Sequence, residues 1–78
     1  MSDSARAAAE FVRLVEIMER LRGPDGCPWD REQTIDTLKP FVLEETYEVL
    51  EAIDRHDHDA LREELGDFVF EAVFVAQM

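Results

Sequence analysis

The sequence predicts an all-α fold, in which an antiparallel helical hairpin follows an N-terminal helix. Apolar residues recur at helical spacing along three stretches, and no run of alternating β-branched residues interrupts them. The chain has 78 residues, a length at which a folded monomer buries only about 63 % of its surface. A core this thin favours association with a second subunit, so we expect a single domain over residues 1–78 that does not remain a monomer.

The predicted elements, in order, are a tail over residues 1–4, a helix over 5–22, a loop over 23–32, a helix over 39–54 and a helix over 59–78. In the first helix Phe11, Leu14 and Met18 lie on one face, and Gly23-Pro24 ends it. The loop is rich in glycine, proline and aspartate, which are turn residues, and it contains the one tryptophan.

The start of the second helix is placed by Pro40, because proline is tolerated only in the first turn of a helix. We therefore expect this helix to begin at Lys39, with Thr37 as a cap upstream. A short polar link over residues 55–58 leads to the third helix, where the acidic side chain of Asp59 suits the amino end.

The balance of charge is strongly acidic, with 19 Asp and Glu against 8 Lys and Arg and a net charge of -11. Nucleic acids and anionic membranes would be repelled by such a surface, so neither is an expected partner. A phosphate-bearing ligand would need a cation between itself and this protein.

The single cysteine, Cys27, excludes an intrachain disulfide and argues against a small secreted fold. The first ten residues lack an apolar core, so no signal peptide is expected, and the longest uncharged stretch, residues 72–78, is far too short for a membrane span. We therefore expect a cytoplasmic protein.

Carboxylates occupy one stripe on each helix of the hairpin. Glu45 and Glu48 lie at the edge of the apolar face of the second helix, and Glu64, Asp67 and Glu71 share a stripe on the third. If the two helices pack antiparallel through their apolar faces, Glu45, Glu48, Glu64 and Asp67 can converge.

Such a cluster has two possible explanations. Like charges about 6 Å apart repel by about 0.7 kcal/mol in water and near 3 kcal/mol at an effective dielectric of 20, so the groups either splay into solvent or bind a divalent cation. Glutamate is a common residue on solvated helix faces, which favours the first explanation. Gly66 favours the second, because a glycine inside a helix suggests that another helix or a ligand approaches closely. An all-oxygen set suits Mg²⁺ or Mn²⁺ far better than zinc.

Three segments together carry a resemblance to a known family. The loop Gly-Cys-Pro-Trp-Asp over residues 26–30, the block Glu44-Glu45-x-x-Glu48 and the block Glu64-x-x-Asp67 follow one another in that order. This arrangement resembles the MazG nucleoside triphosphate pyrophosphohydrolase family, over residues 11–76. The two acidic blocks are similar to the magnesium signature of that family.

The resemblance implies an all-α domain that pairs into a four-helix-bundle-type homo-oligomer, either a dimer or a dimer of dimers. It implies hydrolysis of a nucleoside triphosphate to the monophosphate and diphosphate, in the house-cleaning of nucleotide pools. By the same resemblance Glu45, Glu48, Glu64 and Asp67 would be ligands for Mg²⁺, with Mn²⁺ as a possible substitute.

Further site residues are expected around the metal ligands. Glu44 would orient or deprotonate the attacking water, or is simply solvated. Trp29 would stack on a nucleobase or pin its loop to the core. The basic residues nearest the acidic blocks, and hence candidates for phosphate contact, are Arg31, Lys39 and Arg62. Arg62 has the alternative of pairing with a neighbouring glutamate.

The sequence departs from the family pattern at two positions and at its end. Ile35 and Val75 stand where many relatives have histidine, with consequences for substrate choice, activity or neither. The chain stops inside an apolar stretch with no helix cap, so we expect a C-terminal truncation that removes a further basic helix of the family. Two alternatives to an enzyme therefore stay open, a catalytically weak dimerisation or regulatory module that retains the helical scaffold and an acidic helical interaction domain without metal.

Overall fold

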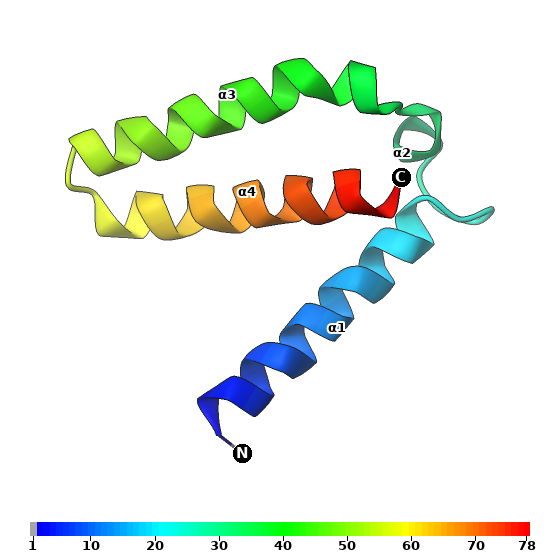
Figure 1. The fold of residues 1–78 in the computed structure, drawn as a ribbon, viewed down its shortest axis with the longest axis horizontal. Helices are drawn as coiled ribbons and strands as arrows, with labels where there is room; N and C mark the ends of the chain where they lie inside the picture. Colours follow the sequence, from blue (N-terminus) through cyan, green and yellow to red (C-terminus); the bar gives the residue numbers. More distant parts are fainter. Residues whose placement is uncertain (1) are drawn as a thin grey trace. The chain divides into compact units, whose positions relative to one another are not determined.

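The computed structural model describes residues 2–78, and over this range it contains no strand and four helices, α1 (Asp3–Leu21), α2 (Pro28–Glu32), α3 (Ile35–Asp54) and α4 (His58–Gln77). The chain divides into two compact units, one that ends at Gln33 and contains α1 and α2, and one over residues 34–76 that contains α3 and most of α4 (Figure 1). The predicted all-α fold is confirmed for the described residues. A single domain over residues 1–78 and its assembly into an oligomer stay predictions.

Helix α1 begins two residues earlier than expected, because the side chain of Ser2 caps it. The Ser2 hydroxyl accepts a hydrogen bond from the Ala5 N–H at 3.1 Å and so satisfies one of the free donors of the first turn. Asp3 in that turn forms an ion pair with Arg6 at 2.9 Å. The predicted tail was therefore wrong for residues 3 and 4, and Met1 lies outside the described residues. The helix ends at Leu21, one residue before its predicted end.

The segment predicted as a loop over residues 23–32 contains the short helix α2. Pro28 occupies its first turn, where the missing N–H costs nothing. Hydrogen bonds from two arginine side chains stabilise the conformation of this segment. Arg22 donates to the Asp30 carbonyl at 3.0 Å, and Arg31 donates to the Pro24 carbonyl.

Gly26 lies directly against the carboxyl end of α1. A Cβ at this position would overlap the carbonyl oxygens of Arg20 and Leu21. The next residue, Cys27, donates its N–H to the Leu21 carbonyl at 3.0 Å, which satisfies an acceptor that the helix itself leaves open. Only glycine allows the loop to close this tightly on the helix end.

The second helix begins at Ile35, so the predicted start at Lys39 was wrong. Thr34 and Thr37 form a reciprocal capping box, in which the Thr37 N–H donates to the Thr34 hydroxyl at 3.2 Å and the Thr34 N–H donates to the Thr37 hydroxyl at 2.9 Å. The N-cap is thus Thr34, with Thr37 as its partner. The box stabilises a first turn upstream of Pro40. The helix therefore tolerates the loss of the backbone hydrogen bond that this proline cannot donate.

A tight turn joins α3 to α4. His56 has a φ of 54°, its N–H donates to the Ile53 carbonyl at 3.0 Å, and the Asp57 N–H donates to the Ala52 carbonyl at 3.2 Å. These two bonds form a Schellman motif, with His56 at the left-handed position that glycine usually takes. Asp57, rather than Asp59, then caps α4 by accepting from the Ala60 N–H at 3.0 Å.

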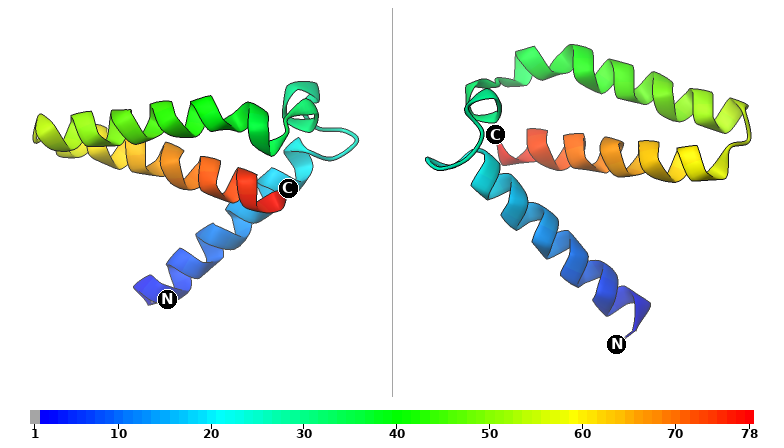
Figure 2. Two further views of the ribbon diagram at one scale, coloured as in Figure 1. Left: turned by 45° about the horizontal axis from the view of Figure 1, so that its top comes forward. Right: turned by 180° about the vertical axis from the view of Figure 1, so that it is seen from behind.

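The turn sends α4 back along α3, and Figures 1 and 2 show the two helices side by side in opposite directions, as the sequence predicted. The buried apolar residues of this hairpin are Leu38, Ala52, Val73 and Phe74. Many large apolar side chains of the same hairpin stay exposed, among them Leu43, Tyr47, Leu50, Leu65 and Val69. No helix within residues 2–78 is long and apolar enough to cross a membrane.

Gly66 does not serve a close approach within this chain. Apart from the chain neighbours and the nearby backbone of α4 itself, a Cβ built on it meets no atom of the described residues within 4 Å. The expectation of a close contact at Gly66 is therefore not met by the hairpin itself.

The two glycines Gly26 and Gly66 make a matched test of loop closure. Gly26→Ala should lower the free energy of unfolding by at least about 1 kcal/mol, because its Cβ would overlap two carbonyl oxygens. Gly66→Ala should raise it by up to about 1 kcal/mol, because alanine is the better helix former and the site is open. Urea unfolding of both variants measures the difference, and equal effects would contradict this description of the loop.

Candidate metal centre

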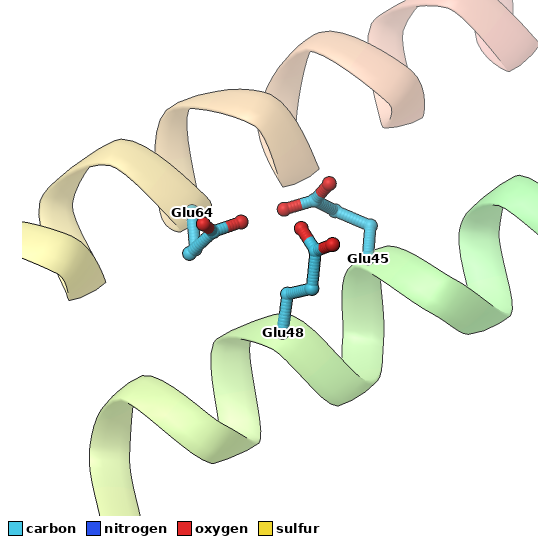
Figure 3. Close-up of side chains that lie close together, drawn as sticks. All are labelled: Glu45, Glu48 and Glu64. Atoms are coloured by element: carbon cyan, nitrogen blue, oxygen red, sulfur yellow. The ribbon is translucent and has the colours of Figure 1, made fainter. Parts of the chain in front are cut away.

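The hairpin brings three glutamates together. Glu45 and Glu48 are three residues apart on α3, so they are neighbours on one helix face. Glu48 stands eight residues before His56 and Glu64 eight residues after it, so an antiparallel hairpin that turns at His56 places them at the same level. Figure 3 shows the three side chains pointing toward one another, Glu45 and Glu48 from α3 and Glu64 from α4. One carboxylate oxygen of each lies within 4.8 Å of those of the other two.

Burial of these carboxylate groups costs free energy of folding. Glu45 is only 9 % exposed, although it is a charged residue type. Its Oε1 atom and the Oε2 atom of Glu64 are buried and have no hydrogen-bond partner among the described residues. A buried acceptor without a donor loses its hydration and gains nothing in return, at a cost of about 1–3 kcal/mol in typical proteins. These oxygens could therefore accept a hydrogen bond or bind a positive group.

The electrostatics of the cluster agree with its geometry. Burial raises the pKa of Glu45 above its ordinary value, and the charges of Glu48, Asp67 and Glu71 raise it further. The pKa of Glu48 is raised chiefly by a hydrogen bond with Glu64 and by the negative charge of that residue. The pKa of Glu64 is raised chiefly by its hydrogen bond with Glu45. Each carboxyl group holds a proton more tightly because the others cannot all be ionised at once.

A divalent cation would remove this conflict. The donor set consists of carboxylate oxygens, which hard ions such as Mg²⁺ and Mn²⁺ prefer, and it offers no thiolate or imidazole that would favour zinc. The unpartnered oxygens of Glu45 and Glu64 supply the acceptors that such an ion requires. The residues present fit a magnesium-type site.

Asp67, the fourth expected ligand, lies outside the group of three converging oxygen atoms. Its charge nevertheless raises the pKa values of Glu45, Glu48 and Glu64, so it is near the cluster. Its role as a ligand stays a prediction.

Glu44 also lies near the cluster, because its charge raises the pKa of Glu48 and that of Glu71. Its own side chain is exposed. A position at the solvent edge of the cluster is compatible with handling a water molecule and equally with simple solvation, so both interpretations of Glu44 stay open.

The other expected site residues are not part of this cluster. Trp29, 49 % exposed, and Arg31 belong to α2 in the first unit, where Arg31 donates to backbone carbonyls of its own loop. Lys39 and Arg62 are exposed on α3 and α4, and Arg62 forms no ion pair with the described residues. Contact of these four residues with a substrate stays a prediction.

The two positions that depart from the family pattern also lie on the hairpin. Ile35 is 61 % exposed at the first residue of α3, and Val75 is partly buried near the end of α4. Nothing in the arrangement of the carboxylates involves Ile35. The effect of both residues on activity stays a prediction.

Glu71 is the residue that sequence analysis did not select. Its Oε2 atom is buried without a hydrogen-bond partner among the described residues. Burial raises its pKa, as do the charges of Asp67, Glu44 and Glu48. The signal was present in the sequence, because Glu71 lies four residues after Asp67 and seven after Glu64, on the same stripe of the helix.

Comparison with known proteins identifies a family and several relatives. Residues 33–78 match the MazG nucleotide pyrophosphohydrolase domain. An Escherichia coli K12 protein named nucleoside triphosphate pyrophosphohydrolase is 64 % identical over 70 residues, which are 88 % of this chain and 27 % of that protein. A Thermotoga maritima protein named nucleoside triphosphate pyrophosphohydrolase/pyrophosphatase MazG is 54 % identical over 68 residues, which are 87 % of this chain and 27 % of that protein. The chain thus spans about a quarter of the length of these curated relatives.

The raised pKa values predict an unusual dependence of stability on pH. The folded chain binds protons at Glu45, Glu64 and Glu71 more tightly than the unfolded chain does. This stabilisation is complete below the ordinary pKa of 4.5 and is lost as pH rises through the raised values. We therefore expect the metal-free chain to melt at a higher temperature at about pH 5 than at about pH 7.

Two variants separate this effect from the general acidity of the chain. Glu45→Gln should flatten the dependence of melting temperature on pH, because it removes the most buried carboxylate of the cluster. Glu16→Gln, an equal change of charge at an exposed position of α1, should leave the slope nearly as it is. A melting temperature that rises with pH in the unmodified chain would contradict the electrostatic description.

Proposed function

The chain belongs to the MazG nucleotide pyrophosphohydrolase family, as its motifs predicted, and we propose that it carries the metal-binding part of a nucleoside triphosphate pyrophosphohydrolase. The proposed reaction converts a nucleoside triphosphate and water to the monophosphate and diphosphate. The observation that supports it best is the convergence of Glu45, Glu48 and Glu64, with buried oxygens that lack a partner.

The acidity of the chain makes a cation necessary for this reaction. A triphosphate is a polyanion and would be repelled by a protein with a net charge of -11. Mg²⁺, with Mn²⁺ as a possible substitute, would be held by Glu45, Glu48 and Glu64, and by Asp67 if it turns toward them. When bound, the ion neutralises phosphate charge and lowers the pKa of water.

Side chains of the protein would assist the remaining steps of the reaction. The water oxygen forms a bond to the α-phosphorus, the bond from that phosphorus to the bridging oxygen breaks, and diphosphate leaves. Glu44, at the solvent edge of the cluster, would orient the water or accept its proton, which then passes to solvent. Trp29, Arg31, Lys39 and Arg62 are proposed contacts to the base and phosphates. Removal of canonical or damaged nucleotides from the nucleotide pool is the proposed cellular role.

We also propose that the active form is a homo-oligomer, either a dimer or a dimer of dimers. A hairpin of two helices leaves part of its apolar surface exposed to solvent unless another element packs on it. Tyr47 is 63 % exposed, Leu43 57 % and Leu50 49 %, which leaves an apolar surface on the hairpin. A second hairpin packed on this surface would complete a four-helix bundle. The same exposed surface supports the alternative of a dimerisation module with weak catalysis.

The direct test is incubation of the purified chain with ordinary and modified nucleoside triphosphates, with Mg²⁺ or with a chelator. Equimolar monophosphate and diphosphate that require the metal are the expected products. Glu48→Gln should reduce turnover by more than about 100-fold, since loss of a mere supporting group at a metal site already costs 10–100-fold. Glu51→Gln, an equal change at an exposed position of the same helix, should change it little.

Three other outcomes have distinct meanings. Product release that needs no metal, or that Glu48→Gln leaves intact, would contradict the proposed site. Metal binding without product release would support the weak dimerisation module. Neither binding nor release would support an acidic interaction domain.

A further inference from the structure

Glu71 lies on the face of α4 that carries Glu64 and Asp67, and its side chain is not fully exposed to solvent. It follows Asp67 by one helical turn and Glu64 by two, so it shares their face of the helix. Its side chain is partly buried, and its Oε2 atom is buried without a hydrogen-bond partner among the described residues. Glu63, on the same helix, is exposed and shows none of these features.

No positive charge of the hairpin compensates Glu71. The charged groups that act on it are Asp67, Glu44 and Glu48, all of the same sign. The ion pairs formed by the described residues involve Asp3 and Glu10 of α1 and Glu51 of α3, and none of them includes Glu71. An isolated chain would be more stable with an apolar or neutral residue here. The carboxylate therefore needs a partner that the hairpin does not provide.

The neighbouring cluster independently indicates what that partner is. Glu45 is nine-tenths buried, one of its carboxylate oxygens is buried without a partner among the described residues, and its side chain points toward Glu48 and Glu64 (Figure 3). Glu71 is electrostatically coupled to Glu45 but lies outside the three atoms that converge within 4.8 Å. It is thus near the proposed cation without being among the converging ligands.

We propose that Glu71 is a positioning residue of the cation site, which accepts a hydrogen bond from water of the hydrated ion and adds a negative charge. This inference rests on the metal binding proposed above. Mg²⁺ in proteins usually keeps several of its waters. Carboxylates that accept from metal-bound groups orient them and commonly contribute 10–100-fold to metal affinity. A buried oxygen with no protein donor is suited to this role.

The test compares Glu71→Gln with Glu63→Gln, which removes the same charge from an exposed position of α4. Calorimetric titration with Mg²⁺ alone measures affinity, and thermal melting without metal measures the fold. Glu71→Gln should weaken Mg²⁺ binding by about 10-fold, and it should raise the metal-free melting temperature because it removes a repelled, partly buried charge. Glu63→Gln should change the affinity less than about 2-fold, since exposed charges are largely screened.

The opposite signs of the two effects separate positioning from mere structural support. A structural role predicts that Glu71→Gln melts at a lower temperature and keeps its Mg²⁺ affinity, and this result would overturn the inference. Equal affinities of Glu71→Gln and Glu63→Gln would also overturn it.

Measurement of Mg²⁺ binding by Glu48→Gln distinguishes an error in the role of Glu71 from an error in the proposed function. If Glu48→Gln abolishes Mg²⁺ binding while Glu71→Gln leaves it unchanged, the metal site stands and only the role of Glu71 is wrong. If the unmodified chain binds no Mg²⁺, both proposals are wrong.

Discussion

Repulsion among carboxylates that the fold holds together is the constraint on which the rest of this structure depends. Two packed helices carry Glu45, Glu48 and Glu64, and a tight turn fixes the register of those helices, so the three carboxylates lie close together. Their raised pKa values are the direct consequence. Repulsion among these carboxylates destabilises the fold when no positive charge is near. Binding of a cation would remove this destabilisation.

The turn between the helices is therefore as important to the site as the ligands themselves. His56 in the left-handed conformation and Asp57 as the cap leave no freedom in the length of the link. The register matters because a shift of one residue along α4 changes the direction of a side chain by about 100° and would turn Glu64 away from Glu48. The register that stabilises the hairpin is the same register that assembles the carboxylates.

Much of this arrangement was predictable from the sequence. The apolar period identified the hairpin, and the spacing of Glu45, Glu48 and Glu64 placed them on facing stripes. The start of α3 was misplaced because a hydroxyl pair at Thr34 and Thr37 outweighs the preference of Pro40 for a first turn, and propensity alone does not show which cap will form. Glu71 was on the correct stripe but was not selected, since burial of one oxygen atom depends on packing that no pattern of residues reveals. Contact of Trp29 and Arg31 with a substrate stays a prediction, because the spacing of residues does not show where a loop lies in the fold.

The most direct test of the cation site is the response of the backbone amide NMR signals to small amounts of Mn²⁺. The paramagnetic ion broadens signals of nearby residues steeply with distance. The account predicts selective broadening around Glu45, Glu48, Glu64 and Asp67, which excess Mg²⁺ reverses and Glu48→Gln abolishes. Uniform broadening over all acidic segments would mean that the ion follows surface charge alone, and it would contradict a site built by α3 and α4.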